Sequence, residues 1–295
     1  MRKFSVLMSL YIKETAEYFD QCMKSMLWQT VRPDEIVIVL DGPISDKVKL
    51  ALQKYQSRYP DWIRTVPLKN NRGLGLALRE GVTQCKYDLI ARMDTDDIAK
   101  RDRFEKQLSA FEKDPELDIC GSHIVEFEGN IRNRLSVRKV PLTHNEIARY
   151  QKQRSAFNHV TVMFKKEAVL RAGNYEDCPL MEDDMLWIRM LIAGAKCSNI
   201  DESLVYVRTG YAMIERRGGW AYFKKYTHGR KMILDTGYIS FWDYWKTICV
   251  QFVVALMPKK LRFLIFTKVL RKVGGGIPVC DRESLGSFCM EGVLC

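Results

Sequence analysis

The chain of 295 residues contains few histidines and lacks the short motifs of several large enzyme classes. It has only 4 histidines, without HExxH or another paired spacing, so a zinc hydrolase is not expected. It contains no GxSxG, and no cysteine stands in a nucleophile motif, which argues against the common serine and cysteine hydrolases. Neither a Walker loop nor GxGxxG is present. Any catalysis must therefore depend on a different arrangement of residues.

A disulfide framework and a secretory signal are also missing. The 9 cysteines are odd in number, include no CxxC pair and are not spaced like zinc ligands. Residues 1–10 form one short strand-like run instead of a charged region followed by an apolar one. We therefore expect free thiols in a reducing cytoplasm.

Acidic residues are scarce in the C-terminal third. Between Arg208 and Lys272 there are 14 basic and 3 acidic residues, whereas the first 207 residues hold 32 and 30. A strongly basic region indicates an anionic partner, either a nucleic acid or a membrane surface. A basic face that is only solvated is the alternative. With 47% apolar and 28% charged residues, the composition is otherwise that of a globular protein.

Strand and helix patterns alternate in the first half of the chain. Short apolar runs predict strands, and apolar residues at helical spacing predict helices between them. The expected strands are residues 4–10, 35–40, 63–68, 87–93 and 117–127, and the expected helices are residues 14–28 and 46–59, a helix that opens at 70–75 and ends near 82, and residues 101–112. Such alternation predicts an α/β fold with a parallel sheet between helices.

The second half is less regular. Residues 130–150 are polar and basic, which indicates an extended or loop region. Strands are expected at 157–164 and 204–207, and helices at 166–172, 181–193, 220–236, 241–257 and 259–272. Residues 274–295 begin with a glycine linker, and we expect this tail to be disordered.

Polar residues follow four of the expected strands at the point where each strand ends. They are Ser9-Leu10-Tyr11, Asp41-Gly42, Asn70 to Gly73, and Asp94 to Asp97. Ligands of open parallel sheets bind in the crevice outside the carboxyl ends of the strands. The sequence therefore predicts a binding site at this edge.

Two acidic groups are candidates for chemistry. Asp94 and Asp96 are carboxylates of the kind that hold Mg²⁺ or Mn²⁺, and such a cation stabilises a diphosphate leaving group. The alternative is an N-cap formed by Asp96 or Asp97. Glu182-Asp183-Asp184 opens a helix and could supply a general base, or could only complement the helix dipole.

Three further features are less specific. The glycines of Asn70 to Gly75 could let a nucleotide approach a helix start, or could form a plain turn. His159 is a lone histidine, and a lone histidine is more often structural than catalytic. The turn at Arg216-Arg217-Gly218-Gly219 could bind phosphate or join two elements.

In this order and spacing, residues 3 to 220 resemble the inverting nucleotide-sugar glycosyltransferases of family 2, which have the GT-A fold. The resemblance is to bacterial enzymes of capsule, exopolysaccharide and O-antigen assembly. The matching segments are Val6 to Tyr11, Gln29 to Gly42, Asn70 to Gly81, Ala91 to Ile98, Asn158-His159, Met181 to Trp187, Arg208 and the arginine–glycine turn. The resemblance implies a mostly parallel, Rossmann-like sheet flanked by helices, with a helical basic C-terminal region.

The resemblance also implies a role for each matching residue. Asp183 would be the base of a single inverting displacement, and Asp94 and Asp96 would bind Mn²⁺ or Mg²⁺. The nucleotide sugar would be bound by Ser9, Tyr11, Asp41, Arg72, Gly73, Asp94 and Arg208. The acceptor side would include Glu182, Asp184, Trp187 and His159.

A division of the chain follows from the same resemblance. Residues 1–128 would bind the nucleotide sugar, and residues 129–218 would form the acceptor-binding and catalytic half of the same domain. Residues 219–273 would be a helical amphipathic region on an anionic membrane surface. A UDP-sugar is the favoured donor, and the acceptor would be a lipid-linked saccharide on the cytoplasmic, inner face of the cell membrane. No nucleic-acid partner is expected.

The chain departs from the family pattern at three positions. Ile12 replaces the usual Asn, Leu40 replaces the first acid of a double Asp, and Met185 replaces an Asp that often follows the catalytic acid. The QxxRW motif of processive synthases is absent, which implies that one sugar is added per event. A nucleic-acid-binding protein, a catalytically inactive membrane-associated scaffold and a sugar nucleotidyltransferase remain as alternatives, the last without its Gly-rich N-terminal loop.

Overall fold

The computed structural model describes residues 2–209 and 218–258. The strands are β1 (Phe4–Leu10), β2 (Glu35–Leu40), β3 (Ile63–Pro67), β4 (Leu89–Arg92), β5 (Ile98–Ala99), β6 (Leu117–Phe127), β7 (Arg134–Arg138), β8 (Met163–Lys165) and β9 (Lys196–Arg208). The helices are α1 (Ala16–Leu27), α2 (Asp46–Arg58), α3 (Leu74–Gln84), α4 (Arg103–Lys113), α5 (His144–Gln151), the 3-10 turn η1 (His159–Thr161), α6 (Lys166–Arg171), α7 (Glu182–Ile192), α9 (Trp220–Asp235) and α10 (Phe241–Leu256).

The described strands form one sheet of nine strands with parallel and antiparallel parts. The order is β3-β2-β1-β4-β8-β6-β9-β5, and β7 pairs with β6. The first four strands in this order run parallel, as the alternating pattern predicts, whereas β8 runs antiparallel to both β4 and β6. The block of four parallel strands therefore ends at β4, the strand that leads into Asp94, and β6 and β9 form a second parallel pair farther along the sheet.

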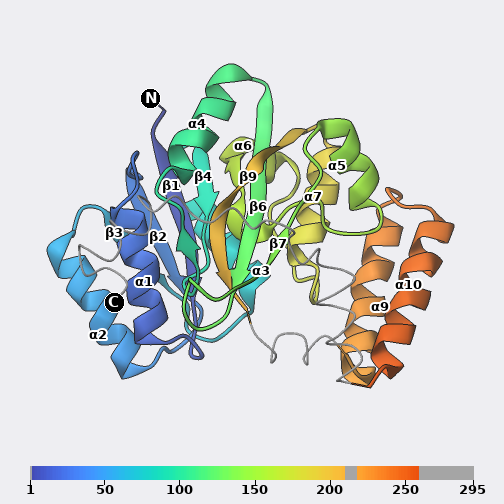
Figure 1. Cartoon of the computed structure of the whole chain (residues 1–295), viewed down its shortest axis with the longest axis horizontal. Helices are drawn as coiled ribbons and strands as arrows, with labels where there is room; N and C mark the ends of the chain where they lie inside the picture. Colours follow the sequence, from blue (N-terminus) through green and yellow to red (C-terminus); the bar gives the residue numbers. More distant parts are fainter. Residues whose placement is uncertain (1, 210–217, 259–295) are drawn as a thin grey trace.

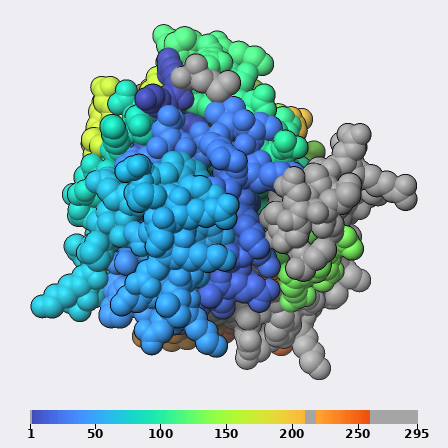
Figure 2. All heavy atoms as spheres, turned by 90° about the vertical axis from the view of Figure 1, so that its left-hand side faces the viewer, coloured from blue at the N-terminus to red at the C-terminus, as the bar shows by residue number. Residues whose placement is uncertain are grey.

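Helices cover both faces of the sheet, giving three layers (Figure 1). One core cluster packs α1, α2 and α4 against one face, and a second packs α3, α5, α6 and α7 against the other. Side chains of β1 alternate between them, with Val6 and Met8 in the first cluster and Leu7 in the second. The N-terminal segments, blue in Figure 2, make up most of the face opposite the C-terminal helices.

Helices α9 and α10 form an antiparallel pair beside α5 and α7, which we call the C-terminal hairpin (Figure 1). Its inner side joins α7 in a third apolar cluster that contains Met181, Met185, Ile188 and Ile233. The hairpin is therefore a helical cap packed on the domain. Within the described ranges, no helix combines the length and the apolar character needed to cross a bilayer.

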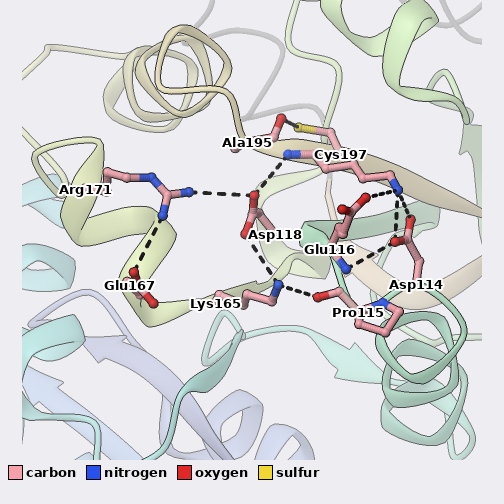
Figure 3. A network of polar contacts seen from close by, with 10 residues as sticks. Asp114, Pro115, Glu116, Asp118, Lys165, Glu167, Arg171, Ala195 and Cys197 are labelled. Carbon is pink, nitrogen blue, oxygen red and sulfur yellow. Dashed lines mark hydrogen bonds and ion pairs between the residues drawn. The ribbon is translucent and has the colours of Figure 1, made fainter.

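The amino-terminal edge of the parallel strands carries paired charges. Lys165 lies opposite Leu89, at the start of β4, and pairs with Asp118 at 3.6 Å. Asp118 also faces Arg171, and Lys196 pairs with Asp114 and Glu116 at 2.9 and 3.2 Å. Figure 3 shows this network, in which each acid has a basic partner. Its charges are neutralised within the chain, which favours a structural role at this edge.

Two expectations from the sequence are only partly correct in the second half, because a helix and a 3-10 turn form where extended chain was expected. Residues 130–150 contain β7 and α5, and α5 begins with a capping box in which Thr143 and Glu146 exchange hydrogen bonds. Residues 157–164 form η1 followed by the short strand β8, because the backbone and side chain of Thr161 both donate to the Asn158 carbonyl. That local turn takes the place of the expected strand. The helix expected at 259–272, the tail at 274–295 and the Arg216-Arg217 turn lie outside the described residues.

Candidate active site at the carboxyl edge of the sheet

The polar strand ends meet at one edge. β1 lies between β2 and β4, and it runs parallel to both. Leu10 pairs with Leu40, and Leu7 pairs with Arg92, so the residues that follow each strand emerge on the same side. The sheet therefore brings together Ser9 and Tyr11, Asp41, and the acids from Asp94 onward, as the sequence predicted.

Asp41 organises the loop before α3. Its carboxylate is buried and accepts hydrogen bonds from the backbone N–H groups of Arg72 and Gly73, at 2.6 and 3.0 Å. Gly73 then begins α3 at φ 86°, a conformation that favours glycine. Both carboxylate oxygens are used in this loop, so Asp41 holds Arg72 and Gly73 beside the edge.

Three carboxylates gather after β4. One oxygen each from Asp94, Asp96 and Asp97 lies within 4.8 Å of the others. Arg92 is 2% exposed, and its guanidinium donates two hydrogen bonds to the carboxylate of Asp94. In one of them, Nη1 lies 2.5 Å from Oδ2. This fork fixes both oxygens of Asp94, and it neutralises one of the three charges.

Asp96 has no basic partner of this kind among the described residues. Burial, together with the charges of Asp94 and Glu14, raises the pKa of Asp96 to about 7. Glu14 reaches the cluster through Thr95, whose hydroxyl donates to Oε2 of Glu14 at 2.6 Å. Sequence reasoning missed Glu14 and Arg92. An arginine inside a buried strand pattern was a signal for Arg92, whereas nothing local marks Glu14, 81 positions before Thr95.

Arg208 stabilises the loop that carries these acids. Its backbone N–H donates to Asp97 at 2.7 Å, and its Nε donates to the carbonyl of Asp96 at 3.1 Å. Its two terminal nitrogens donate to Gly129 and Gln21, and the guanidinium lies 3.8 Å from the ring centre of Tyr18. The guanidinium is thus engaged within the chain, and its contact with a diphosphate stays a prediction.

The first turn of α7 places a second group of acids near the first. Burial and the charges of Asp184 and Glu182 raise the pKa of Asp183 well above its ordinary value. Burial also raises the pKa of Glu182, on which the charges of Arg92 and Asp94 act as well. Among the described residues, Asp183 accepts no hydrogen bond from another side chain. These effects indicate that the two acidic groups, which lie far apart in sequence, face one region of space.

Neighbouring elements hold this turn in place. Gln151, at the end of α5, donates from Nε2 to Asp184 at 2.7 Å and accepts from the N–H of Ala156 at 2.8 Å. Gly75 in α3 lies so close that a Cβ there would be 2.9 Å from the Cβ of Glu182. The helix after the donor-side loop and the helix with the acids are therefore in direct contact.

His159 and Trp187 lie in an aromatic cluster beneath the acids. Trp187 is 1% exposed and packs near Phe157, Tyr175 and His159. The Nε2 of His159 lies 2.9 Å from the hydroxyl of Tyr175, and burial beside the charge of Arg92 lowers the pKa of His159 well below its ordinary value. A neutral histidine in this cluster supports the site from below, and contact of either residue with an acceptor stays a prediction.

Comparison with known proteins identifies the family. Residues 5–178 match the family described as Glycosyl transferase family 2. The chain belongs to this family. It is a glycosyltransferase of the GT-A fold, as the resemblance implied, and it shares 38% identity with the amylovoran biosynthesis glycosyltransferase AmsE of Erwinia amylovora, over 90% of this chain and 98% of that protein.

Two further comparisons give a relative and a solved structure. The UDP-Gal:alpha-D-GlcNAc-diphosphoundecaprenol beta-1,3-galactosyltransferase of Escherichia coli is 36% identical over 92% of this chain and 97% of its own. The mannosyltransferase PcManGT from Pyrobaculum calidifontis, solved with GDP-Man and Mn²⁺, is 14% identical and matches with a TM-score of 0.60 over 99% of this chain and 85% of its own. At that identity the solved structure shows the shared fold alone.

The acids after β4 suit a divalent cation. Mg²⁺ and Mn²⁺ prefer carboxylate oxygens, and the cluster offers three of them around Asp96. The repulsion that raises the pKa of Asp96, and also that of Asp97, is the kind that a bound cation relieves. Because Arg92 holds Asp94 and Arg208 donates to Asp97, Asp96 is the carboxylate best placed to bind an ion.

Proposed function

We propose that this glycosyltransferase transfers one sugar per event from a UDP-sugar to a lipid-linked saccharide, with inversion, in the biosynthesis of a surface polysaccharide. The observation that carries the proposal is the pairing of two acidic groups, one after β4 and one at the start of α7, at the carboxyl edge of the sheet. The group after β4 suits the binding of a cation beside a diphosphate, and the group at the start of α7 suits the role of a general base. The Escherichia coli relative, whose name specifies UDP-Gal and a diphosphoundecaprenol-linked sugar, supports the donor and the acceptor class.

One half of the domain would bind the donor and the other half would bind the acceptor. Residues 1–128 would hold the donor, with Ser9, Tyr11 and the loop that Asp41 orders lying along the nucleotide. Asp96, with Asp94 beside it, would hold Mn²⁺ or Mg²⁺, and that cation supplies positive charge for the diphosphate leaving group. Residues 129–218 would hold the acceptor, next to Glu182 and Asp184.

Asp183 would act as the general base. It accepts the proton of the acceptor hydroxyl while that oxygen bonds to the anomeric carbon from the face opposite the diphosphate, and the bond to the diphosphate oxygen breaks. The raised pKa of Asp183 suits this task, because a stronger base takes the proton more readily. A single displacement of this kind inverts the anomeric centre.

A lipid-linked acceptor would bring the C-terminal hairpin close to a membrane. Trp242, Trp245 and Val253 of α10 are 79%, 45% and 59% exposed, and the residues that follow α10 are rich in lysine and arginine. Exposed aromatic and aliphatic side chains beside basic residues suit the interface of an anionic membrane. We therefore place the enzyme on the inner, cytoplasmic face of the cell membrane, with residues 219–273 against the lipid.

A thermal-shift titration with UDP, GDP, dTDP and CMP, each with and without Mn²⁺, tests the donor site. A ligand that binds only the folded state raises the unfolding midpoint. We expect UDP to give the largest rise, more with Mn²⁺, and Asp96→Ala to remove the contribution of the metal. Failure of all four nucleotides to raise the midpoint would contradict the donor site.

Transfer assays with Asp183→Asn test the base. We expect about a 10²- to 10⁴-fold loss of turnover, because general-base catalysis contributes about that much. The same variant should keep the nucleotide-dependent thermal shift of the wild-type protein. Turnover within about twofold of wild type would remove Asp183 from the mechanism.

A further inference from the structure

The C-terminal hairpin touches the elements that carry and support the acids of α7. Gly229 of α9 lies against Met181 and Pro179, just before α7, where an added Cβ would be 3.1 Å from both the sulfur of Met181 and the carbonyl of Pro179. The charge of Asp184 acts on the hydroxyl of Tyr226, another residue of α9. The hairpin is therefore packed directly behind the first turn of α7 (Figure 1).

A buried arginine makes a second connection. Arg230 is 3% exposed, and its guanidinium donates to the carbonyl of Lys152 at 2.8 Å and to the hydroxyl of Thr247 at 3.1 Å. It forms no ion pair within the described part of the chain. Burying a charge without an opposite charge is unfavourable, so these polar contacts must hold the guanidinium in a defined place.

Lys152 and Gln151 connect Arg230 to the acids of α7. Lys152 directly follows Gln151, and the amide of Gln151 donates to Asp184 at 2.7 Å. Gln151 is 1% exposed, and its other amide atom is held by Ala156 at 2.8 Å. Because Lys152 and Gln151 are adjacent in the backbone, a shift of the Lys152 carbonyl would displace the Gln151 amide and, through it, Asp184.

We propose that the C-terminal hairpin positions the acidic turn of α7, and that Arg230 and Gln151 are the positioning residues that carry this effect to Asp184 and its neighbour Asp183. The inference rests on the proposed role of Asp183 as base. A misplacement of about 1 Å at a reacting group can lower a rate by about 100-fold, so small displacements of this turn affect turnover. The hairpin then has a catalytic task in addition to any contact with lipid.

Arg230→Gln and Gln151→Leu test the proposal, with Lys231→Gln as the matched control. Lys231 is the next residue in α9, and its exposed side chain pairs with Asp235 one turn later. We expect each test variant to lower kcat by about tenfold or more, while KM for the UDP-sugar and the UDP-dependent thermal shift stay at their wild-type values. Arg230→Lys should recover part of the lost kcat, because an ammonium can still reach one carbonyl. The control should match wild type.

Other results would overturn the proposal. One is a folded Arg230→Gln protein with kcat within about twofold of wild type. Another is a fall of kcat and nucleotide affinity together, since a general loss of structure would cause both. If Arg230→Gln does not fold, Gln151→Glu replaces it, because it keeps the shape while placing a carboxylate against Asp184. Absence of transfer in the wild-type protein would instead count against the proposed function.

Discussion

Burial, together with the charges of Asp94 and Glu14, raises the pKa of the Asp96 carboxyl group above that of an ordinary aspartate. The folded protein then holds this proton more tightly than the unfolded chain does. Its contribution to stability is therefore greatest at acidic pH, and it is lost as the pH rises from the ordinary value of 3.8 toward about 7. Above that pH the ionised group destabilises the metal-free fold.

Asp96→Asn should stabilise the metal-free protein at pH 8. The amide keeps the shape of the side chain and removes the repelled charge, so we expect the unfolding midpoint to rise by about 2 °C or more. Thermal unfolding at pH 5 and pH 8 checks this, because the gain should be smaller at pH 5. Glu167→Gln is the control, since Glu167 is an exposed acid far from the cluster. A lower midpoint for Asp96→Asn at pH 8 would show that the charge is not repelled.

At the scale of elements, the site depends on the contact between α3 and α7. A Cβ at position 75 would lie 2.7 Å from the carbonyl of Glu176 and 2.9 Å from the Cβ of Glu182. Both atoms belong to the segment that begins α7, and one is backbone, so the neighbour cannot simply rotate away. Gly75 is therefore what lets the helix after the donor loop approach the helix with the acids.

Gly75→Ala should separate these two helices. We expect a loss of about 1–3 kcal/mol of stability from overpacking, and a fall in kcat because the acidic turn moves. Gly81→Ala is the matched control in the same helix. Its Cβ would clash with Leu7 and lie 2.8 Å from Val39, inside the core and away from α7. Denaturant unfolding and transfer assays distinguish the two, and equal kcat per folded molecule in both variants would contradict this account.

At the scale of the whole molecule, the C-terminal hairpin carries many exposed apolar side chains, and its part of the sequence is strongly basic. The exposed apolar side chains of the C-terminal hairpin include Trp220, Phe241, Trp242, Trp245 and Leu256, all at least 45% exposed. The region from Arg208 to Lys272 also holds most of the excess positive charge. A surface of this composition should bind anionic lipid more strongly than neutral lipid.

Co-sedimentation with vesicles checks this expectation. The full chain should bind vesicles that contain an anionic phospholipid, with less binding in high salt, and should bind purely zwitterionic vesicles weakly. Trp242→Ser combined with Trp245→Ser should reduce binding several-fold. Leu50→Ser is the control, because Leu50 is 67% exposed on α2, far from the hairpin. Equal binding of the double variant and the control would exclude the exposed tryptophans as the lipid contact.

Elements with local signals could be predicted from the sequence. Apolar runs located β1 to β4 almost to the residue, and the acids of Asp94 to Asp97 and Glu182 to Asp184 were visible as clusters. Because parallel strands share a carboxyl edge, the sequence also predicted that the polar residues after β1, β2, β3 and β4 would meet there. The family resemblance added the roles, and comparison with relatives confirmed the family and the fold.

The contacts that hold those residues in place became visible in the folded structure. The paired hydrogen bonds from Arg92 to Asp94 depend on burial. Other contacts join positions remote in the chain, namely Glu14 with Thr95, and Arg208 with Gln21 and Gly129. The contacts that link Arg230 to Asp184 through Lys152 and Gln151 also join residues remote in the chain. A local pattern reports period and turn chemistry, but it carries no information on which distant side chain satisfies a buried charge. That choice is made by packing, and it determines which acids remain available for chemistry.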